Sequence, residues 1–137
     1  MNWDPFIVCQ PNQSPPKPRD IHSKEGIGDR MRSAAFAELQ ATRAFKWASE
    51  HFNDVPEQLK DDWARVSKME QDHLDAIIKR MDELEISLQE KPVSSRLWDS
   101  LMKCKTGKEF CLFISSAEER GRQAGVKLCQ AIKKTDP

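Results

Sequence analysis

Apolar side chains recur at spacings of three and four over three long stretches of the chain, residues 28–52, 54–84 and 106–134. This spacing is typical of amphipathic helices, and no stretch shows the clear period-two alternation of a half-buried strand. A shorter apolar set after Ser94 or Ser95 predicts a brief connecting helix. The apolar positions on the three long stripes are Ala34, Ala35, Leu39, Phe45, Ala48 and Phe52, then Trp63, Val66, Leu74, Ile77, Met81 and Leu84, then Phe110, Phe113, Ile114, Ala117, Gly121, Ala124 and Leu128. The pattern predicts an all-α bundle of three long helices and one short helix.

Flanking residues indicate where two of these helices begin. Asp54 and Pro56 interrupt the pattern after the first stripe. Asp54 followed by Glu57 has the spacing of a capping box, and proline is tolerated in a first helical turn. Thr106 and Glu109 have the same spacing before the last stripe. We therefore expect side-chain caps at the starts of the second and last long helices.

The first 24 residues differ from the rest of the chain. They contain five of the eight prolines and show no helical periodicity, which predicts an extended, proline-rich N-terminal arm. Its apolar residues are Trp3, Phe6, Ile7 and Val8. These side chains could anchor the arm across the bundle, or the arm could be an exposed interaction segment. The expected organisation is an arm at 1–24 and a helical bundle at 25–137.

Composition and charge narrow the choice of partners. A chain of 137 residues can bury one hydrophobic core but is too short for two. The 22 basic and 22 acidic residues cancel, so no overall field attracts nucleic acid or an anionic membrane. Arg30, Arg32, Arg43 and Lys46 follow one helix, but such a run is usually a solvated helix face. We therefore do not expect nucleic-acid binding.

Cysteine usage and the absence of targeting signals bear on location. Cys9, Cys104, Cys111 and Cys129 form no Cys-x-x-Cys pair. The sequence shows neither a signal peptide nor an apolar run long enough to cross a membrane. We therefore expect a reduced, cytoplasmic setting with no membrane association.

Residues that could bind metal interrupt each of the three long stripes. At about 100° per residue on a helical wheel, Glu38 falls at the centre of the first apolar arc. Glu70 and His73, one turn apart, fall together on the second arc. On the last helix Glu118 lies at the flank of the stripe, whereas Glu119 points away from it. An ionised carboxylate in an apolar interior is costly unless a cation balances it, so the wheel predicts a metal site at Glu38, Glu70, His73 and Glu118.

These residues match most of a known ligand set. A Glu from each of two helices plus Glu-x-x-His from each of two others is the ligand set of di-iron and di-manganese bundles, and the chain supplies three of these four elements.

The same residues also allow a second interpretation without metal. A Glu at a stripe edge can extend to solvent, and a lone His can be a hydrogen-bonded core residue. The set would then be a polar network in a non-enzymatic, protein-binding bundle. His22 and His51 have weaker claims and remain unassigned.

Several segments together resemble an uncharacterised ferritin-like family, a domain of unknown function. They are Phe36–Ala41, Trp47-Ala48, Phe52–Pro56, Glu70–His73, Pro92-Val93 with Trp98, and Glu118–Gly121. The resemblance covers about residues 26–134. That family is in turn similar to the di-iron monooxygenase that hydroxylates a modified adenosine in tRNA. The resemblance implies a four-helix ferritin-like bundle with Glu38, Glu70, His73 and Glu118 as direct metal ligands.

The chain departs from this pattern at its end. The residues Thr135-Asp136-Pro137 suggest the turn before a fourth helix, and the sequence stops there. We therefore expect a fragment, or else a homodimer or a partner chain that completes the bundle. Glu38, Glu70 and His73 could still bind one iron ion with open coordination positions. The resulting hypothesis is a protein that binds iron, or alternatively manganese, with oxidase or oxygenase ancestry at a di-iron or mono-iron centre.

Overall fold

Four helices form the core of the structure, a computed structural model that describes residues 1–135. They are α1 (Lys24–His51), α2 (Glu57–Glu83), α3 (Arg96–Leu101) and α4 (Gly107–Thr135). No strand occurs within residues 1–135, where one isolated parallel bridge joins Val8 to Val93. The prediction of an all-α chain is therefore confirmed. Asp136 and Pro137, at which the sequence suggests a further turn, lie outside the described residues.

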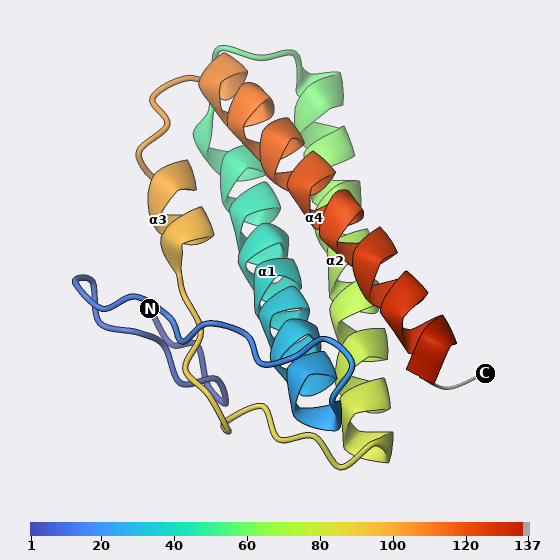
Figure 1. Ribbon diagram of the computed structural model, residues 1–137. Coiled ribbons are helices and arrows are strands. Elements are labelled where there is room, and N and C mark those ends of the chain that lie inside the picture. The colour runs from blue at the N-terminus through green and yellow to red at the C-terminus, as the bar shows by residue number, and fades with distance from the viewer. Residues whose placement is uncertain (136–137) are drawn as a thin grey trace.

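The order of the helices determines their directions in the bundle (Figure 1). α1 and α2 are antiparallel neighbours joined by a short turn. The segment between α2 and α4, which includes α3, then returns along the bundle to the end at which α2 began. As a result, α4 runs parallel to α2 and antiparallel to α1. It packs against α1 and α3.

The structure confirms one of the two predicted helix caps and adds one that was not predicted. α1 begins at Lys24, four residues before the expected Gly28, because the Ser23 hydroxyl accepts the Gly26 amide at 2.9 Å. The expected cap at Thr106 is confirmed, since its hydroxyl accepts the Glu109 amide at 3.1 Å. The expected cap at Asp54 is wrong. No side chain caps the start of α2, where Pro56 occupies the N-cap position.

Asp54 caps a different helix instead. Its two carboxylate oxygens lie 3.0 and 3.1 Å from the backbone nitrogen of Gly107, the first residue of α4. A side chain at position 107 would overlap Val55, so only glycine fits beside this turn. The α1–α2 turn therefore fixes the start of α4, an arrangement that depends on two segments 53 residues apart.

Two hydrophobic clusters fill the bundle. The first joins the C-terminal half of α1 to the starts of α2 and α4, and consists of Ala41, Ala44, Phe45, Ala48, Phe52, Trp63, Leu101, Phe110 and Ile114. The second joins the N-terminal half of α1 to the later part of α2, to the N-terminal residues and to the linker, residues 84–95 between α2 and α3. It consists of Trp3, Phe6, Ala35, Phe36, Leu74, Met81 and Val93. The two clusters therefore lie at different places along α1 and α2, and a short stretch of each helix lies between them.

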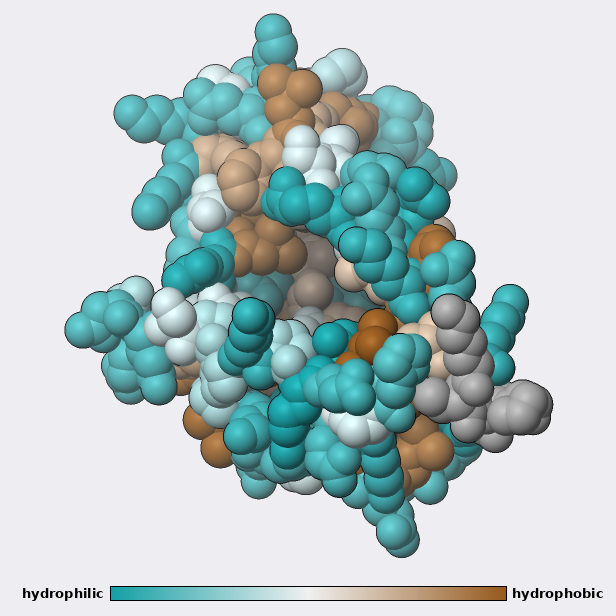
Figure 2. Space-filling view, viewed as in Figure 1, coloured by the Kyte–Doolittle hydropathy of each residue, from teal (hydrophilic) through white to brown (hydrophobic). Residues whose placement is uncertain are grey.

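The inner stripe of α4 is buried only toward its two ends. Phe110 and Ile114 are buried against the first cluster, and Ala131 is buried near the other end. Phe113, Gly121 and Ala124, all expected on the buried stripe, are exposed. Figure 2 shows a hollow edged by apolar side chains on the face that α4 crosses. The stripe prediction is wrong at these positions because no described element covers this part of α4.

The N-terminal residues make specific contacts with the helices. The Trp3 and Phe6 rings pack on Phe36, with centroids 5.3 and 5.0 Å away. The guanidinium of Arg43 lies 4.4 Å above the Trp3 ring, within the range of a cation–π interaction. Ile7, the residue after Phe6, is 50% exposed. Trp3 and Phe6 therefore belong to the core of the molecule.

An ion network connects the N-terminal residues to α1 and to the linker. The Arg19 guanidinium donates to Asp29 at 2.7 Å and to Glu90 at 2.7 Å. Arg32 also pairs with both carboxylates, and its side chain is only 1% exposed. Arg32 thus corrects the expectation of a solvated helix face, because its partners come from the linker as well as from α1. Among the described residues, no helix is both long and apolar enough to cross a membrane.

Candidate metal centre

Three potential metal ligands converge between α1 and α2. Glu38 lies near the middle of α1, and Glu70 and His73 lie one turn apart on α2. The His73 Nδ1 atom lies 3.6 Å from Glu70 Oε2 and 4.0 Å from Glu38 Oε2. One donor atom from each residue lies within 4.8 Å of the other two. The structure therefore brings together three of the four residues that the sequence singles out.

The site occupies the interval between the two hydrophobic clusters. Along α1, Glu38 follows the second cluster and precedes the first, and Glu70 lies between Trp63 and Leu74 on α2. The side chains of Glu38 and Glu70 are 26% and 15% exposed, whereas that of His73 is 57% exposed. The carboxylates thus face the interior, and the imidazole borders solvent.

The two partly buried carboxylates have few partners for their charge. Burial raises the pKa of Glu70, and the nearby His73 only partly offsets this shift. The Oε2 atom of Glu38 is buried and has no hydrogen-bond partner. A buried acceptor without a partner costs free energy, and it is uncommon in native proteins. A proton or a cation bound between these carboxylates would therefore stabilise the site.

Glu118 approaches this site from α4 without joining the group of three. Its side chain is exposed, and it is not among the donors within 4.8 Å of one another. Desolvation raises the pKa of Glu118, and the negative charge of Glu70 raises it further. The adjacent Glu119 instead pairs with Arg122 at 2.7 Å. Glu118 is thus the acidic residue of α4 that lies within the electrostatic field of the site.

The donor set and its spacing suit a transition metal. Carboxylate oxygens and imidazole nitrogens bind such ions at about 2.0–2.2 Å, so neighbouring donors around one ion are about 3 Å apart. The observed His73 distances of 3.6 and 4.0 Å exceed ordinary hydrogen bonds, so the imidazole is not hydrogen-bonded to either carboxylate. Glu38, Glu70 and His73 could therefore hold a metal ion.

The structure also reveals polar residues around the site that sequence reasoning missed. The hydroxyl of Ser67, one turn before Glu70, donates to the Thr42 carbonyl at 2.7 Å. The Thr42 hydroxyl oxygen, one turn after Glu38, is buried without a hydrogen-bond partner. A small polar residue on an apolar stripe is the only sequence signal for either. His22 and His51 are exposed and lie outside the group of three.

Comparison with known proteins places the chain in a family. No curated protein and no solved structure matches the sequence. Residues 4–135 match the family described as "Protein of unknown function (DUF455)", so the match covers all four helices and most of the residues that precede them. This chain therefore belongs to the DUF455 family.

Proposed function

We propose that this protein binds iron through Glu38, Glu70 and His73. The observation that carries the proposal is the unpartnered, buried Oε2 atom of Glu38 beside the imidazole of His73. A cation between these donors would satisfy Glu38 and offset the desolvation of Glu70. Manganese fits the same donors, and Glu118 is the residue of α4 that could add a further carboxylate.

The same geometry disfavours a purely structural polar network. Such networks stabilise a core when every member is hydrogen-bonded. Here the His73 distances to both carboxylates exceed 3.5 Å, and one acceptor has no partner at all. Metal binding therefore explains these residues better than the non-enzymatic alternative does.

The proposed activity is oxidoreduction. Iron held by two carboxylates and one histidine retains open coordination positions, as in non-haem iron oxygenases, which activate dioxygen. Glu38, Glu70 and His73 would hold the ion, and the 57% exposure of His73 leaves this side of the site accessible to a substrate. The sequence resemblance to ferritin-like proteins supports the same class of chemistry.

Iron binding is the decisive experiment. Anaerobic addition of Fe²⁺ followed by removal of free metal should leave about one iron ion per chain, measured by elemental analysis. Glu70→Gln and His73→Ala should each abolish this binding. The matched controls Asp72→Asn and His22→Ala remove exposed groups of the same kinds and should retain it. Equal iron content in all four variants would exclude the proposed site.

We further propose that a second copy of the chain, or a partner chain, covers the open side of the site. The middle of α4, around Gly121 and Ala124, and the His73 side chain are both exposed. Light scattering with and without iron tests this step, and a homodimer would give twice the 15.8 kDa chain mass. A fully iron-loaded monomer would contradict it and would leave the iron site itself intact.

A further inference from the structure

Two buried side-chain atoms within residues 1–135 have no hydrogen-bond partner, and both belong to α1. They are the Oε2 atom of Glu38 and the hydroxyl oxygen of Thr42. Residues four apart on a helix are neighbours on one face, with about 5–6 Å between their Cβ atoms. A buried polar atom without a partner is uncommon in native proteins. Two such atoms one turn apart therefore indicate a partner that they share.

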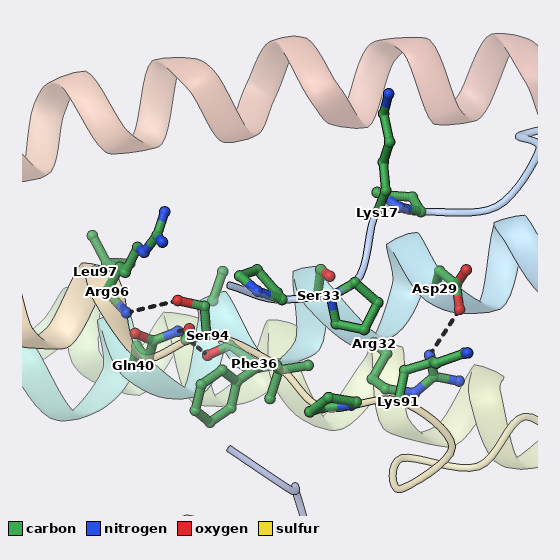
Figure 3. Close-up of a pocket in the computed structure, with 16 residues that line it drawn as sticks. Lys17, Asp29, Arg32, Ser33, Phe36, Gln40, Lys91, Ser94, Arg96 and Leu97 are labelled. Atoms are coloured by element: carbon green, nitrogen blue, oxygen red, sulfur yellow. Dashed lines mark hydrogen bonds and ion pairs between the residues drawn. The ribbon is translucent and has the colours of Figure 1, made fainter. Parts of the chain in front are cut away.

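Gln40, two residues after Glu38, belongs to the other side of α1 and has all its hydrogen bonds. Its side-chain nitrogen donates to the carbonyls of Phe36 and Ser94 at 3.3 and 3.2 Å (Figure 3). Its side-chain oxygen accepts the Trp98 amide at 3.0 Å. Residues two apart differ by about 200° around a helix axis. The missing partners are thus particular to the side of α1 that carries Glu38.

The Thr42 hydroxyl also makes no bond within its own helix. A serine or threonine hydroxyl in a helix can donate to the carbonyl three or four residues earlier. Ser49, later on α1, does so, because its hydroxyl lies 2.7 Å from the Lys46 carbonyl. Thr42 makes no such bond. Its hydroxyl is therefore free both to donate to and to accept from another group.

A hydrogen bond between helices holds this part of α1 against α2. The Ser67 hydroxyl donates to the Thr42 carbonyl at 2.7 Å, and Glu70 follows Ser67 by one turn. A Glu70 oxygen lies within 4.8 Å of a Glu38 oxygen. Two oxygens at this separation can share one water molecule, since each hydrogen bond to it spans about 2.8 Å. The two carboxylates and the Thr42 hydroxyl thus supply the two to four polar partners that a buried water needs.

We propose that Thr42 is a positioning residue of the candidate metal centre, whose hydroxyl holds a water molecule against Glu38 Oε2. This water satisfies both unpartnered atoms and orients the Glu38 carboxylate. Its presence requires no metal. The consequence for metal binding rests on the proposed function, because a ligand oriented by a hydrogen-bonded neighbour binds its metal more tightly.

A double-mutant cycle in metal-free protein tests the shared water. Thr42→Val keeps the shape of the side chain and should lower the urea midpoint, because it leaves Glu38 without its water. In the Glu38→Leu background the same change should not lower the midpoint, since no carboxylate remains to share the water. Ser49→Ala is the control and should have the same effect in both backgrounds. Equal effects of Thr42→Val in the two backgrounds would overturn the proposal.

Mn²⁺ affinity tests the link to the metal centre. Mn²⁺ suits the same donors, and electron paramagnetic resonance measures the free ion. Thr42→Val should weaken binding about ten-fold, as is usual when a hydrogen-bonded neighbour of a ligand is lost. Thr42→Ser, which retains the hydroxyl, should bind nearly as tightly as the unmodified protein, and Ser49→Ala should not change the affinity.

The outcomes separate this inference from the proposed function. Equal Mn²⁺ affinity in Thr42→Val and the unmodified protein would overturn the positioning role and leave the metal site intact. Equal weakening in Thr42→Val and Thr42→Ser would show that packing, and not the hydroxyl, is responsible. If the unmodified protein bound neither Mn²⁺ nor Fe²⁺, the proposed function would fail, and the metal-free cycle would still decide whether Thr42 and Glu38 share a water.

Discussion

Two carboxylates of this protein, the buried Asp29 and the partly buried Glu70, have opposite environments. Asp29 accepts hydrogen bonds from Arg19 and Arg32, which hold its pKa well below the usual range. No arginine among the described residues pairs with Glu70, so burial raises its pKa and His73 offsets only part of the shift. Asp29 is therefore a satisfied structural charge. Glu70 lacks such charge compensation, and this difference distinguishes a candidate ligand from an ordinary ion pair.

Removing the charge of Glu70 should change the titration of Glu118. The negative charge of Glu70 raises the pKa of Glu118, so Glu70→Gln should lower that pKa in the metal-free protein. Carboxyl ¹³C shifts measured against pH would report the change. Asp72→Asn on the outer side of α2 serves as the control and should leave Glu118 unaffected. An unchanged pKa in Glu70→Gln would place Glu118 outside the field of the site.

Asp29→Asn should destabilise the protein in a pH-dependent manner. Because the pKa of Asp29 is depressed in the folded state, its contribution is present above the ordinary value of about 3.9 and is lost as pH falls below it. Loss of a buried pair costs about 3 kcal/mol, so the free energy of unfolding should fall by that amount near pH 7. The difference from the unmodified protein should narrow below about pH 4.

Urea unfolding at several pH values measures both parts of this prediction. The exposed Asp72→Asn provides a control that should match the unmodified protein throughout. A stability difference that stayed constant down to about pH 2 would show that the ionised form of Asp29 is not the source of the effect.

At the scale of elements, the α1–α2 turn and the start of α4 form one unit. Asp54→Ala removes the carboxylate that accepts the Gly107 amide and should cost about 1 kcal/mol, as for the loss of an N-cap. Thermal unfolding would measure it. Asp61→Ala, at an exposed position in the first turns of α2, should have little effect. Equal melting temperatures for the two variants would mean that Asp54 does not stabilise α4.

Periodicity predicted the helices because each stripe depends on neighbours three and four residues away. The Thr106 cap was predictable for the same local reason. The role of Asp54 was not, since its partner Gly107 is distant in sequence. Arg32 is a similar case, because only the folded linker and arm reveal its partners. Spacing likewise placed Glu38, Glu70 and His73 on facing helices, while their separations required the structure.

At the scale of the whole molecule, Trp3 and Phe6 bring the N-terminal residues into the core. Trp3→Ala should lower the free energy of unfolding by about 3 kcal/mol, because the ring is buried among Phe36, Trp98 and Arg43. Denaturant unfolding monitored by circular dichroism would measure this loss. Ile7→Ala, in the same arm but half exposed, is the matched control and should cost much less. Similar losses for both variants would indicate that the arm packs differently.

The exposed stretch of α4 has a consequence for local stability. Around Gly121 and Ala124 the helix buries little apolar surface, so local unfolding of this stretch breaks few contacts and costs little free energy. Its backbone amides should exchange with deuterium well before those in the middle of α1, whose inner face is buried. A metal ion that recruited Glu118 would link α4 to α1 and α2 and should slow this exchange. Deuterium uptake along α4 would therefore report whether its carboxylate takes part in holding the ion.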